Sequence, residues 1–323
     1  MSDLVSNVSI LSAVVSFVIT ASLAPVVIPF LRKIKCGQTV RDDGPKSHLK
    51  KTGTPTMGGI LILFSVIVSS VFCVKEYPKI APILFMTAGF GLLGFLDDFI
   101  KVVGRRSEGL TPWQKMAGQL VITGLFAYYL LCFQDVSLAM KIPFLTGMYI
   151  DFGNWNVFLL FFIVLGTVNG VNFTDGLDGL AGSVTVIVAV FFTVVAIGTE
   201  SGIEPITCAV AGALMGFLLF NVHPASVFMG DTGSLALGGF VAACAYMLQM
   251  PLYIAIVGVV YLIEVASVIL QVSYFKISGG RRLLKMAPLH HHFELSGWTE
   301  TGIVAAFTIV TAVMCLVGLM GLN

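Results

Sequence analysis

The chain has 323 residues, of which 57% are hydrophobic and only 11% are charged, and its mean hydropathy is +0.97. Soluble domains carry about 25% charged residues, so this composition excludes an ordinary water-soluble globular protein. The formal net charge of +1 excludes no class of partner, but apolar runs recur along the whole length and predict a chain embedded in a bilayer.

Apolar runs of roughly 17–25 residues predict ten transmembrane helices. In chain order they cover residues 8–31, 57–74, 80–99, 113–133, 155–171, 179–198, 204–221, 233–249, 251–274 and 300–321. The division between the eighth and ninth helices rests only on the interruption at Gln249–Pro251. The first basic residue, Arg32, follows the first apolar run. A signal peptide has its positive charge before the apolar core, so this run is predicted to be an uncleaved span.

The basic residues are distributed unevenly between alternate connections. Fifteen of the 18 Lys and Arg residues fall in one set of connections, and the other set holds only Lys75, Lys79 and Lys141. The positive-inside rule places the larger set in the cytoplasm. The sequence therefore predicts an all-α integral membrane protein, a single polytopic domain over residues 1–323 with ten transmembrane helices and both termini extracytoplasmic.

Two smaller features complete the expected fold. Residues 134–154 contain short alternating apolar stretches with Gly147 near a turn, which predicts a small external β-hairpin. The six cysteines have no CxxC spacing and lie mostly in or beside apolar runs, so we interpret them as small hydrophobic residues rather than as disulfide partners or metal ligands.

Polar residues gather at the cytoplasmic face. The five dense polar segments cover residues 41–59, 94–101, 169–182, 221–234 and 285–294. All five are predicted on the same side of the membrane, which indicates one composite site. The loops that carry it are about 32–56, 100–112, 172–178, 222–232 and 275–299.

Asp97 and Asp98 are predicted at the C-terminal end of the third span. A carboxylate there opposes the helix dipole and cannot cap the free carbonyl groups, so a purely structural role is disfavoured. Neighbouring residues of a helix point about 100° apart, so the two acids are expected to do different jobs. Either a metal ion or a lysine such as Lys101 must offset their charge.

The acids of the two later segments have a serious structural alternative. Asp175 and Asp178 precede an apolar run, where aspartate is a good helix N-cap, and Asp231 or Thr232 could cap the helix that follows them in the same way. Glycines flank Asp231, as in a tight turn around a ligand, and Asp231 near Asp97 and Asp98 would complete an oxygen-rich site suited to Mg²⁺.

Residues 290–292 are three consecutive histidines, and 53–59 read GTPTMGG. Consecutive residues cannot all face one ligand, so a zinc site made from the histidines alone is disfavoured, and neutral imidazoles that bind phosphate or move protons fit better. The hydroxyls and backbone donors of GTPTMGG suit a phosphate or a sugar. Neither a Walker A sequence nor a GxGxxG after a strand occurs, so ATP hydrolysis and dinucleotide binding have no support.

Glu264 lies near the middle of the ninth span, where a carboxylate is either functional or paired within the bundle. Glycines 89, 91, 94, 238 and 239 are interpreted as helix-packing contacts. A transporter would hold its ionisable residues near the membrane midplane between inverted repeats, and only Glu264 lies that deep. Acids, lysines and histidines at one face instead favour an enzyme of phosphoryl transfer.

Several motifs resemble the polyprenyl-phosphate N-acetylhexosamine-1-phosphate transferase superfamily, and most closely its phospho-N-acetylmuramoyl-pentapeptide transferase family. These motifs are GTPTMGG, LDDFIK, NFTDGLDGLAG, FMGDTGSLALGG and APLHHHFE. The APLHHHFE run separates this family from relatives that use UDP-N-acetylglucosamine. The resemblance extends from end to end and implies ten transmembrane helices, a homodimer and Mg²⁺ dependence.

The resemblance also implies a reaction and a set of site residues. The reaction converts UDP-N-acetylmuramoyl-pentapeptide and undecaprenyl phosphate to lipid I and UMP at the bacterial inner membrane, and no nucleic-acid partner is expected. Asp231 would bind Mg²⁺, and Asp97 and Asp98 would be the essential acids, with Asp97 favoured as the base. The catalytic set would be Asp97, Asp98, Asp231, His290 and His291. The substrate-binding set would be Lys51, Thr56, Lys101, Lys115, Asn172, Asp175, Asp178, Phe228, Gln271 and His292, with Phe228 giving the uracil an aromatic face.

Overall fold

The computed structural model describes residues 7–34, 51, 53–104, 108–133 and 137–322. Most of the predicted loop 32–56 therefore lies outside the described residues, as do residues 105–107 of the predicted loop 100–112.

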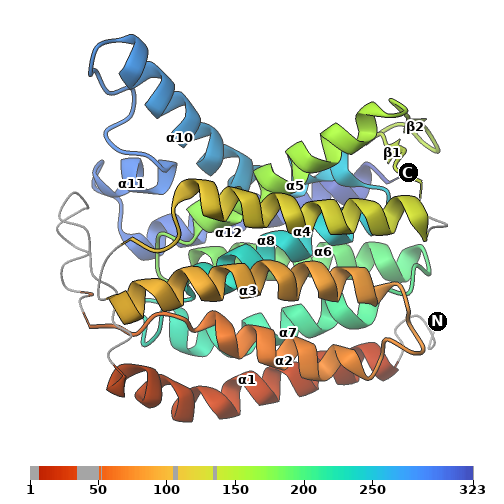
Figure 1. Cartoon of the computed structure of the whole chain (residues 1–323), viewed down its shortest axis with the longest axis horizontal. Helices are drawn as coiled ribbons and strands as arrows, with labels where there is room; N and C mark the ends of the chain where they lie inside the picture. The colour runs from red at the N-terminus through yellow and green to blue at the C-terminus, as the bar shows by residue number, and fades with distance from the viewer. Residues whose placement is uncertain (1–6, 35–50, 52, 105–107, 134–136, 323) are drawn as a thin grey trace.

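The described chain is mainly helical (Figure 1). Its elements are α1 (Asn7–Lys33), α2 (Gly59–Val71), α3 (Ile80–Gly104), α4 (Pro112–Cys132), β1 (Met140–Lys141), β2 (Tyr149–Ile150), α5 (Trp155–Thr174), α6 (Leu180–Gly198), α7 (Glu204–Asn221), α8 (Gly230–Met247), η2 (Pro251–Tyr253), α9 (Ile254–Val257), α10 (Val259–Ile277), α11 (Leu289–Glu294) and α12 (Glu300–Met320).

Eight helices in the described part of the chain are long and apolar enough to cross a membrane, which makes this a multi-pass membrane protein. The other two predicted spans differ in character. The span predicted at 57–74 is the 13-residue helix α2. The span predicted at 233–249 is α8, whose sequence is rich in glycine and alanine and whose side chains from Thr232 to Met247 are buried. A count of ten spans is therefore not established by helix length and composition.

The prediction of one continuous helix over 251–274 is wrong. The segment starts as the short elements η2 and α9, and a regular helix, α10, begins only at Val259 and continues to Ile277. Pro251 has no N–H to donate at the start of this segment. Gly258 breaks the helical geometry between α9 and α10 with φ −100° and ψ 22°.

Helix α8 occupies the centre of the bundle, with α3 and α5 packed directly on it. A Cβ atom added at Gly238 would lie 2.5 Å from the Cα of Val168 in α5, and one at Gly239 would lie 2.6 Å from the Phe90 ring in α3. Only glycine allows backbones to approach this closely. The interpretation of these glycines as helix-packing contacts is confirmed, and this contact places the start of α8 beside the end of α3.

The predicted β-hairpin is confirmed, with Met140 paired to Ile150 in an antiparallel ladder and Gly147 at φ +68° in the connection. The hairpin is tied to the C-terminal end of the chain, where the Phe144 N–H donates to the Gly321 carbonyl at 3.0 Å. In Figure 1 the first turn of α1, the last turn of α12 and the hairpin lie at one end of the bundle, and α11 lies at the other end.

Helix α10 leans out of the bundle (Figure 1). Its second half exposes large apolar side chains, among them Ile269, Leu270 and Val272, whereas Glu264 in its first half is fully buried. An exposed apolar surface on a helix of this kind is suited to contact with lipid.

Candidate active site

Three carboxylates meet where α3 ends and α8 begins. Asp97 and Asp98 come from the last turns of α3, and Asp231 is the second residue of α8. One ligand atom of each lies within 4.8 Å of the others. The approach depends on Gly94, because a Cβ there would lie 2.0 Å from the Asp231 carbonyl oxygen. The local sequence thus places three acids together by letting two helix backbones touch.

The buried Asp98 carboxylate caps α8 from the neighbouring helix. It accepts hydrogen bonds from the Asp231 N–H at 3.2 Å, from the Thr232 N–H at 2.9 Å and from the Thr232 hydroxyl at 2.7 Å. These bonds satisfy amide groups that the first turn of a helix leaves free. Asp98 therefore joins α3 to α8, a role that the sequence did not indicate.

The alternative that Asp231 itself caps α8 is wrong, because that helix has no side-chain cap of its own. The Asp231 carboxylate points instead toward cations and an amide. Lys101 and Lys115 each place their Nζ 3.0 Å from its Oδ2, and Asn172 donates to its Oδ1 at 2.8 Å. Burial alone would raise the pKa of Asp231, but the charges of Lys115 and Lys101 hold it well below its usual range.

The two lysines neutralise only part of the acidic charge. Lys101 also lies 2.5 Å from Asp97 Oδ2 and 3.8 Å from Asp98 Oδ1, and Lys115 lies 3.3 Å from the Asn172 side-chain oxygen. Three carboxylates against two ammonium groups leave one negative charge in excess. Hard carboxylate oxygens with an excess of negative charge are the donor set that Mg²⁺ prefers.

Asp175 lies beside this centre and does not cap the following helix. It is the residue after the last turn of α5, whereas α6 begins at Leu180, behind Gly179, which has no side chain to cap it. Burial, followed by the charges of Asp231 and Asp98, raises the pKa of Asp175 well above its ordinary value. The N-cap alternative for Asp175 is therefore wrong, and this carboxyl is held in a strongly acidic neighbourhood.

Asp178 belongs to a second charged cluster, and it too caps no helix. Lys51 lies 2.8 Å from Asp178 Oδ1 and 2.5 Å from Glu300 Oε1, and the Asp178 N–H donates to the same Glu300 oxygen at 2.7 Å. His223 Nδ1 lies 3.1 Å from Asp178 Oδ2. Burial lowers the pKa of Lys51, but hydrogen bonds to Asp178 and Glu300 outweigh it and raise the pKa above its usual value.

Glu300 and His223 were not predicted as site residues. Glu300 is in the first turn of α12, where an acid is ordinary because it suits the helix dipole. His223 lies within the predicted polar segment 221–234, but nothing in the sequence pairs it with Asp178. Only the three-dimensional contact joins them.

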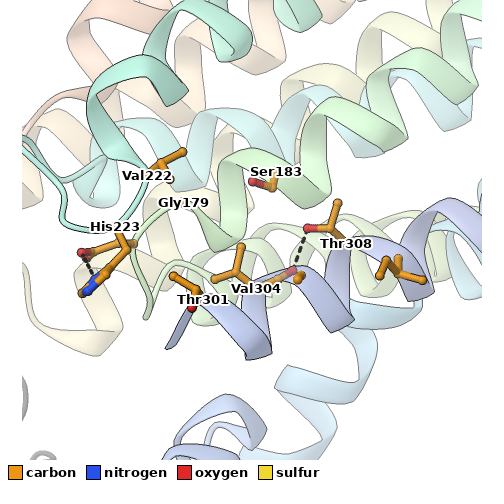
Figure 2. Close-up of a pocket in the computed structure, with 10 residues that line it drawn as sticks. Gly179, Ser183, Val222, His223, Thr301, Val304 and Thr308 are labelled. Atoms are coloured by element: carbon orange, nitrogen blue, oxygen red, sulfur yellow. Dashed lines mark hydrogen bonds and ion pairs between the residues drawn. The ribbon is translucent and has the colours of Figure 1, made fainter. Parts of the chain in front are cut away.

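A cavity of about 410 Å³ opens beside this second cluster, between α6 and α12 (Figure 2). Its polar end holds Asp178 and His223, whose Oδ2 and Nδ1 atoms lie 3.1 Å apart, and its sides carry Val304 and Thr308 of α12. The cavity is thus polar at one end and mainly apolar along its length.

The three histidines have different partners, as expected for consecutive residues of a helix. His290 is fully buried, His291 Nδ1 lies 2.7 Å from Glu294 Oε2, and His292 Nδ1 accepts the Lys285 N–H at 3.1 Å. His290 packs against Gly176, the residue after Asp175, because a Cβ at Gly176 would lie 2.1 Å from its Nε2. The first histidine is therefore placed against the Asp175–Gly176 loop.

The remaining predicted residues divide into two groups. Thr56 lies at the acid centre, since a Cβ at Gly230 would lie 2.8 Å from its hydroxyl and 2.6 Å from Asp98 Oδ2. Phe228 pairs with the same segment, its N–H donating to the Pro55 carbonyl at 2.8 Å. Gln271 is engaged elsewhere, because its side-chain amide bonds the backbone of Leu283 and Leu284.

Comparison with known families adds an independent finding. A family model described as Glycosyl transferase family 4 matches residues 80–249, which is more than half of the chain and includes all three acids of the centre. A sequence signature described as Phospho-N-acetylmuramoyl-pentapeptide-transferase signature 1 matches residues 51–63, which include Lys51 and Thr56.

Full-length relatives carry the same description. A phospho-N-acetylmuramoyl-pentapeptide-transferase of Clostridium perfringens is 47% identical over 315 residues, covering 97% of this chain and 98% of that protein. A protein of the same description from Acetivibrio thermocellus is 49% identical, covering 96% of this chain and 94% of that protein. Another from Caldicellulosiruptor bescii is 47% identical, covering 96% of this chain and 96% of that protein.

Proposed function

The chain belongs to the phospho-N-acetylmuramoyl-pentapeptide-transferase family, and on this premise we propose that it transfers phospho-N-acetylmuramoyl-pentapeptide from its UDP carrier to undecaprenyl phosphate. The products are lipid I and UMP, and the reaction is the first membrane step of peptidoglycan synthesis, on which cell shape and division depend. The observation that carries the proposal is the meeting of Asp97, Asp98 and Asp231 with Lys101 and Lys115 at one end of a membrane bundle.

The reaction joins two anionic phosphates, so the site must hold them together and offset their charge. An oxygen of the lipid phosphate attacks the phosphorus that bears the sugar. The bond from that phosphorus to the bridging oxygen breaks, and the bridging oxygen leaves with UMP. Lys101 and Lys115 are placed to offset charge on the two phosphates, because their ammonium groups already converge on one oxygen of Asp231.

Asp97 is the favoured base of this reaction. Both oxygens of Asp98 are occupied by the cap on α8, whereas Asp97 has one oxygen on the Leu110 N–H at 2.8 Å and the other on Lys101. A lysine can move away when a phosphate arrives, whereas the cap cannot be released without opening the start of α8. Asp97 can therefore take up a proton of the lipid phosphate.

The three carboxylates fit a Mg²⁺ cofactor, and Asp231 is the proposed ligand. The fit rests on the oxygen donor set, its excess negative charge and the ligand-atom separations within 4.8 Å. When bound, the ion supplies charge stabilisation at the transferring phosphate. Asn172 would orient Asp231, since its amide holds the second oxygen of that carboxylate.

The nucleotide-sugar pocket is proposed along the same face of the bundle. The residues assigned to it are Lys51, Thr56, Asn172, Asp175, Asp178, Phe228, Gln271, His290, His291 and His292. Phe228 is half-buried and its backbone pairs with the Thr56 segment, and its ring is proposed as the face for the uracil. Gln271 would have to exchange its bonds to the Leu283–Leu284 backbone for substrate, so it is the most indirect member of the set.

The finer topology is also a proposal. Ten spans with both termini outside place the acid centre at the cytoplasmic face of the inner membrane, where the soluble donor is available. Support comes from the segregation of basic residues and from the position of the hairpin at the end opposite α11 (Figure 1). A homodimer is expected from the family resemblance.

The test is a comparison of donors with purified protein, undecaprenyl phosphate and Mg²⁺, in which the release of UMP is measured. We expect release with UDP-N-acetylmuramoyl-pentapeptide and none with UDP-N-acetylglucosamine. Equal release from both donors would favour a UDP-N-acetylglucosamine transferase instead. Movement of donor or lipid across a bilayer without UMP would indicate a transporter.

A further inference from the structure

Glu264 is a fully buried carboxylate in the first half of α10, outside the acid centre. Its two oxygens face the start of α11, the helix that carries the three histidines. Oε2 accepts the Leu289 N–H at 2.7 Å, and Oε1 accepts the His290 N–H at 3.2 Å. A buried acid of this kind is costly unless its oxygens are hydrogen-bonded, and here both are.

Helix α11 has no cap from its own sequence. The preceding residue is Pro288, which makes no side-chain cap, so the Leu289 and His290 amides would otherwise be unpaired in a buried position. Glu264 supplies the missing acceptors from another helix, 25 residues earlier in the chain for Leu289. The start of α11 is therefore fixed to the membrane bundle through one side chain.

The same carboxylate lies beside the His290 ring. Nδ1 of His290 is 3.2 Å from Glu264 Oε1, and the ring is fully buried. On its other side, Nε2 packs so closely against Gly176 that a Cβ there would lie 2.1 Å away. Neither ring nitrogen makes a hydrogen bond among the described residues, so the hold of Glu264 on His290 runs through the backbone N–H, and Nε2 remains available to a group bound at the Asp175 loop.

We propose that Glu264 is a positioning residue, which caps α11 and holds His290 between α10 and the Asp175–Gly176 loop. This inference rests on the proposed function, since it assigns Glu264 to the site that carries out the transfer. The chemistry of His290 then depends on a carboxylate that touches no substrate. The competing role for Glu264 is to stabilise the bundle through its contact with His290 without affecting the reaction. That role predicts a different result in the experiment below.

The experiment compares Glu264→Gln and Glu264→Ala with the wild type in detergent. Gln keeps one acceptor oxygen, whereas Ala keeps none, so the effect should be graded. The matched control is Ser267→Ala, because Ser267 is buried one turn along α10 and its hydroxyl donates to the backbone carbonyl oxygen of Glu264 and not to its carboxylate. The three readouts are kcat, KM for the nucleotide-sugar and the thermal midpoint.

A fourth readout is independent of the reaction. Carbethoxylation of each histidine by diethyl pyrocarbonate is followed by mass spectrometry. His290 should be protected in the wild type because it is fully buried, and His223, whose side chain is 41% exposed, is the internal control that reacts in every variant. The modification of His290 does not depend on which donor the protein uses. It therefore still tests the role of Glu264 if the proposed function is wrong.

We expect Glu264→Ala to lower kcat by about 10- to 100-fold, the range seen when the partner that orients a metal-bound histidine is removed. KM should change by less than about threefold, and His290 should become labelled. Gln should lie between Ala and the wild type, and Ser267→Ala should match the wild type. If Glu264→Ala does not fold, Glu264→Gln alone is compared with the wild type. A lower thermal midpoint with wild-type kcat per folded molecule and a protected His290 would overturn the proposal.

Discussion

Three aspartates that are alike in sequence differ in their environment at the residue scale. Asp98 has its oxygens filled by amide and hydroxyl donors of α8, and Asp231 is held by two lysines and Asn172. Asp97 shares Lys101 with the other two and keeps only one amide donor, that of Leu110. Local bonding therefore separates a cap, a candidate metal ligand and a candidate base.

Replacing Asp231 by Asn should lower turnover by orders of magnitude and leave the protein folded. Asn keeps the size of the side chain but loses the charge, and a lost metal ion forfeits several kcal/mol of stabilisation of the transferring phosphate. The measurement is UMP release across a Mg²⁺ titration, with thermal stability recorded in parallel. Asp151→Asn, in the region of the β-hairpin, is the control. Near-normal turnover of Asp231→Asn at ordinary Mg²⁺ would contradict the metal role.

Replacing Asp98 by Asn should lower stability as well as turnover. The new NH₂ group would face an amide or hydroxyl donor of Thr232 or Asp231, so one bond of the cap is lost and costs about 1 kcal/mol. The thermal midpoint in detergent should fall for Asp98→Asn and stay near the wild-type value for the control Asp151→Asn, whose side-chain oxygen keeps its two hydrogen bonds. Equal midpoints for Asp98→Asn and Asp151→Asn would show that Asp98 does not act as the cap.

The raised pKa of Asp175 predicts a pH dependence of stability. A carboxyl that binds its proton more tightly in the folded state makes that state less stable as pH rises from its unfolded pKa of about 3.9 toward its folded pKa. Asp175→Asn removes this loss. The thermal midpoint of the variant minus that of the wild type should therefore increase as the pH rises from about 4. A difference that is flat or falls over this range would contradict the assignment.

At the scale of elements, the site depends on contact between the backbones of α3 and α8. Gly94→Ala places a Cβ 2.0 Å from the Asp231 carbonyl oxygen, so we expect a loss of about 1–3 kcal/mol and displacement of the acids. The matched control is Gly166→Ala in α5, where a Cβ would meet nothing within 4 Å. Thermal midpoint and UMP release should fall only for Gly94→Ala, and tolerance of both alanines would refute the close contact.

The positions of helices could be predicted from the sequence far better than their contacts. Long apolar runs predicted α1, α3 and α12 within a few residues, because length and hydropathy are local properties. The break at Gly258 was missed because the run around it remains apolar. The cap that Asp98 places on α8 was also missed, since a bond between residues 134 apart leaves no local pattern.

At the scale of the whole molecule, the sequence predicted that five distant polar segments share one face. Asp97, Asp98, Lys101, Lys115, Asn172 and Asp231 do meet, because positive charge and polar motifs mark the same ends of successive helices. Glu300 and His223 could not be predicted, since an acid in the first turn of a helix is ordinary. Their cluster depends on how α12 packs against α6.

The proposed topology has a direct test. Single cysteines in a Cys-free background at Ser47, Ser107 and Ser278 should react only with a reagent on the cytoplasmic side, and one at Ser137 only with a reagent outside. Ser47 and Ser107 lie outside the described residues, and Ser278 and Ser137 flank α10 and the hairpin. A reversal at any of the four positions would break the ten-span arrangement and the shared cytoplasmic site.

The central claim is that a phospho-sugar passes from nucleotide to lipid at the acid centre, and position-specific isotope labelling tests it most directly. The donor is labelled separately at the phosphorus bound to the sugar and at the phosphorus bound to uridine, then incubated with protein, undecaprenyl phosphate and Mg²⁺. We predict that the sugar-side label moves into the lipid extract in an amount equal to the UMP released, and that the uridine-side label stays with UMP. Asp231→Asn should abolish the transfer of label to lipid and the release of UMP. Uridine-side label in the lipid, or lipid labelling unaffected by Asp231→Asn, would contradict the account.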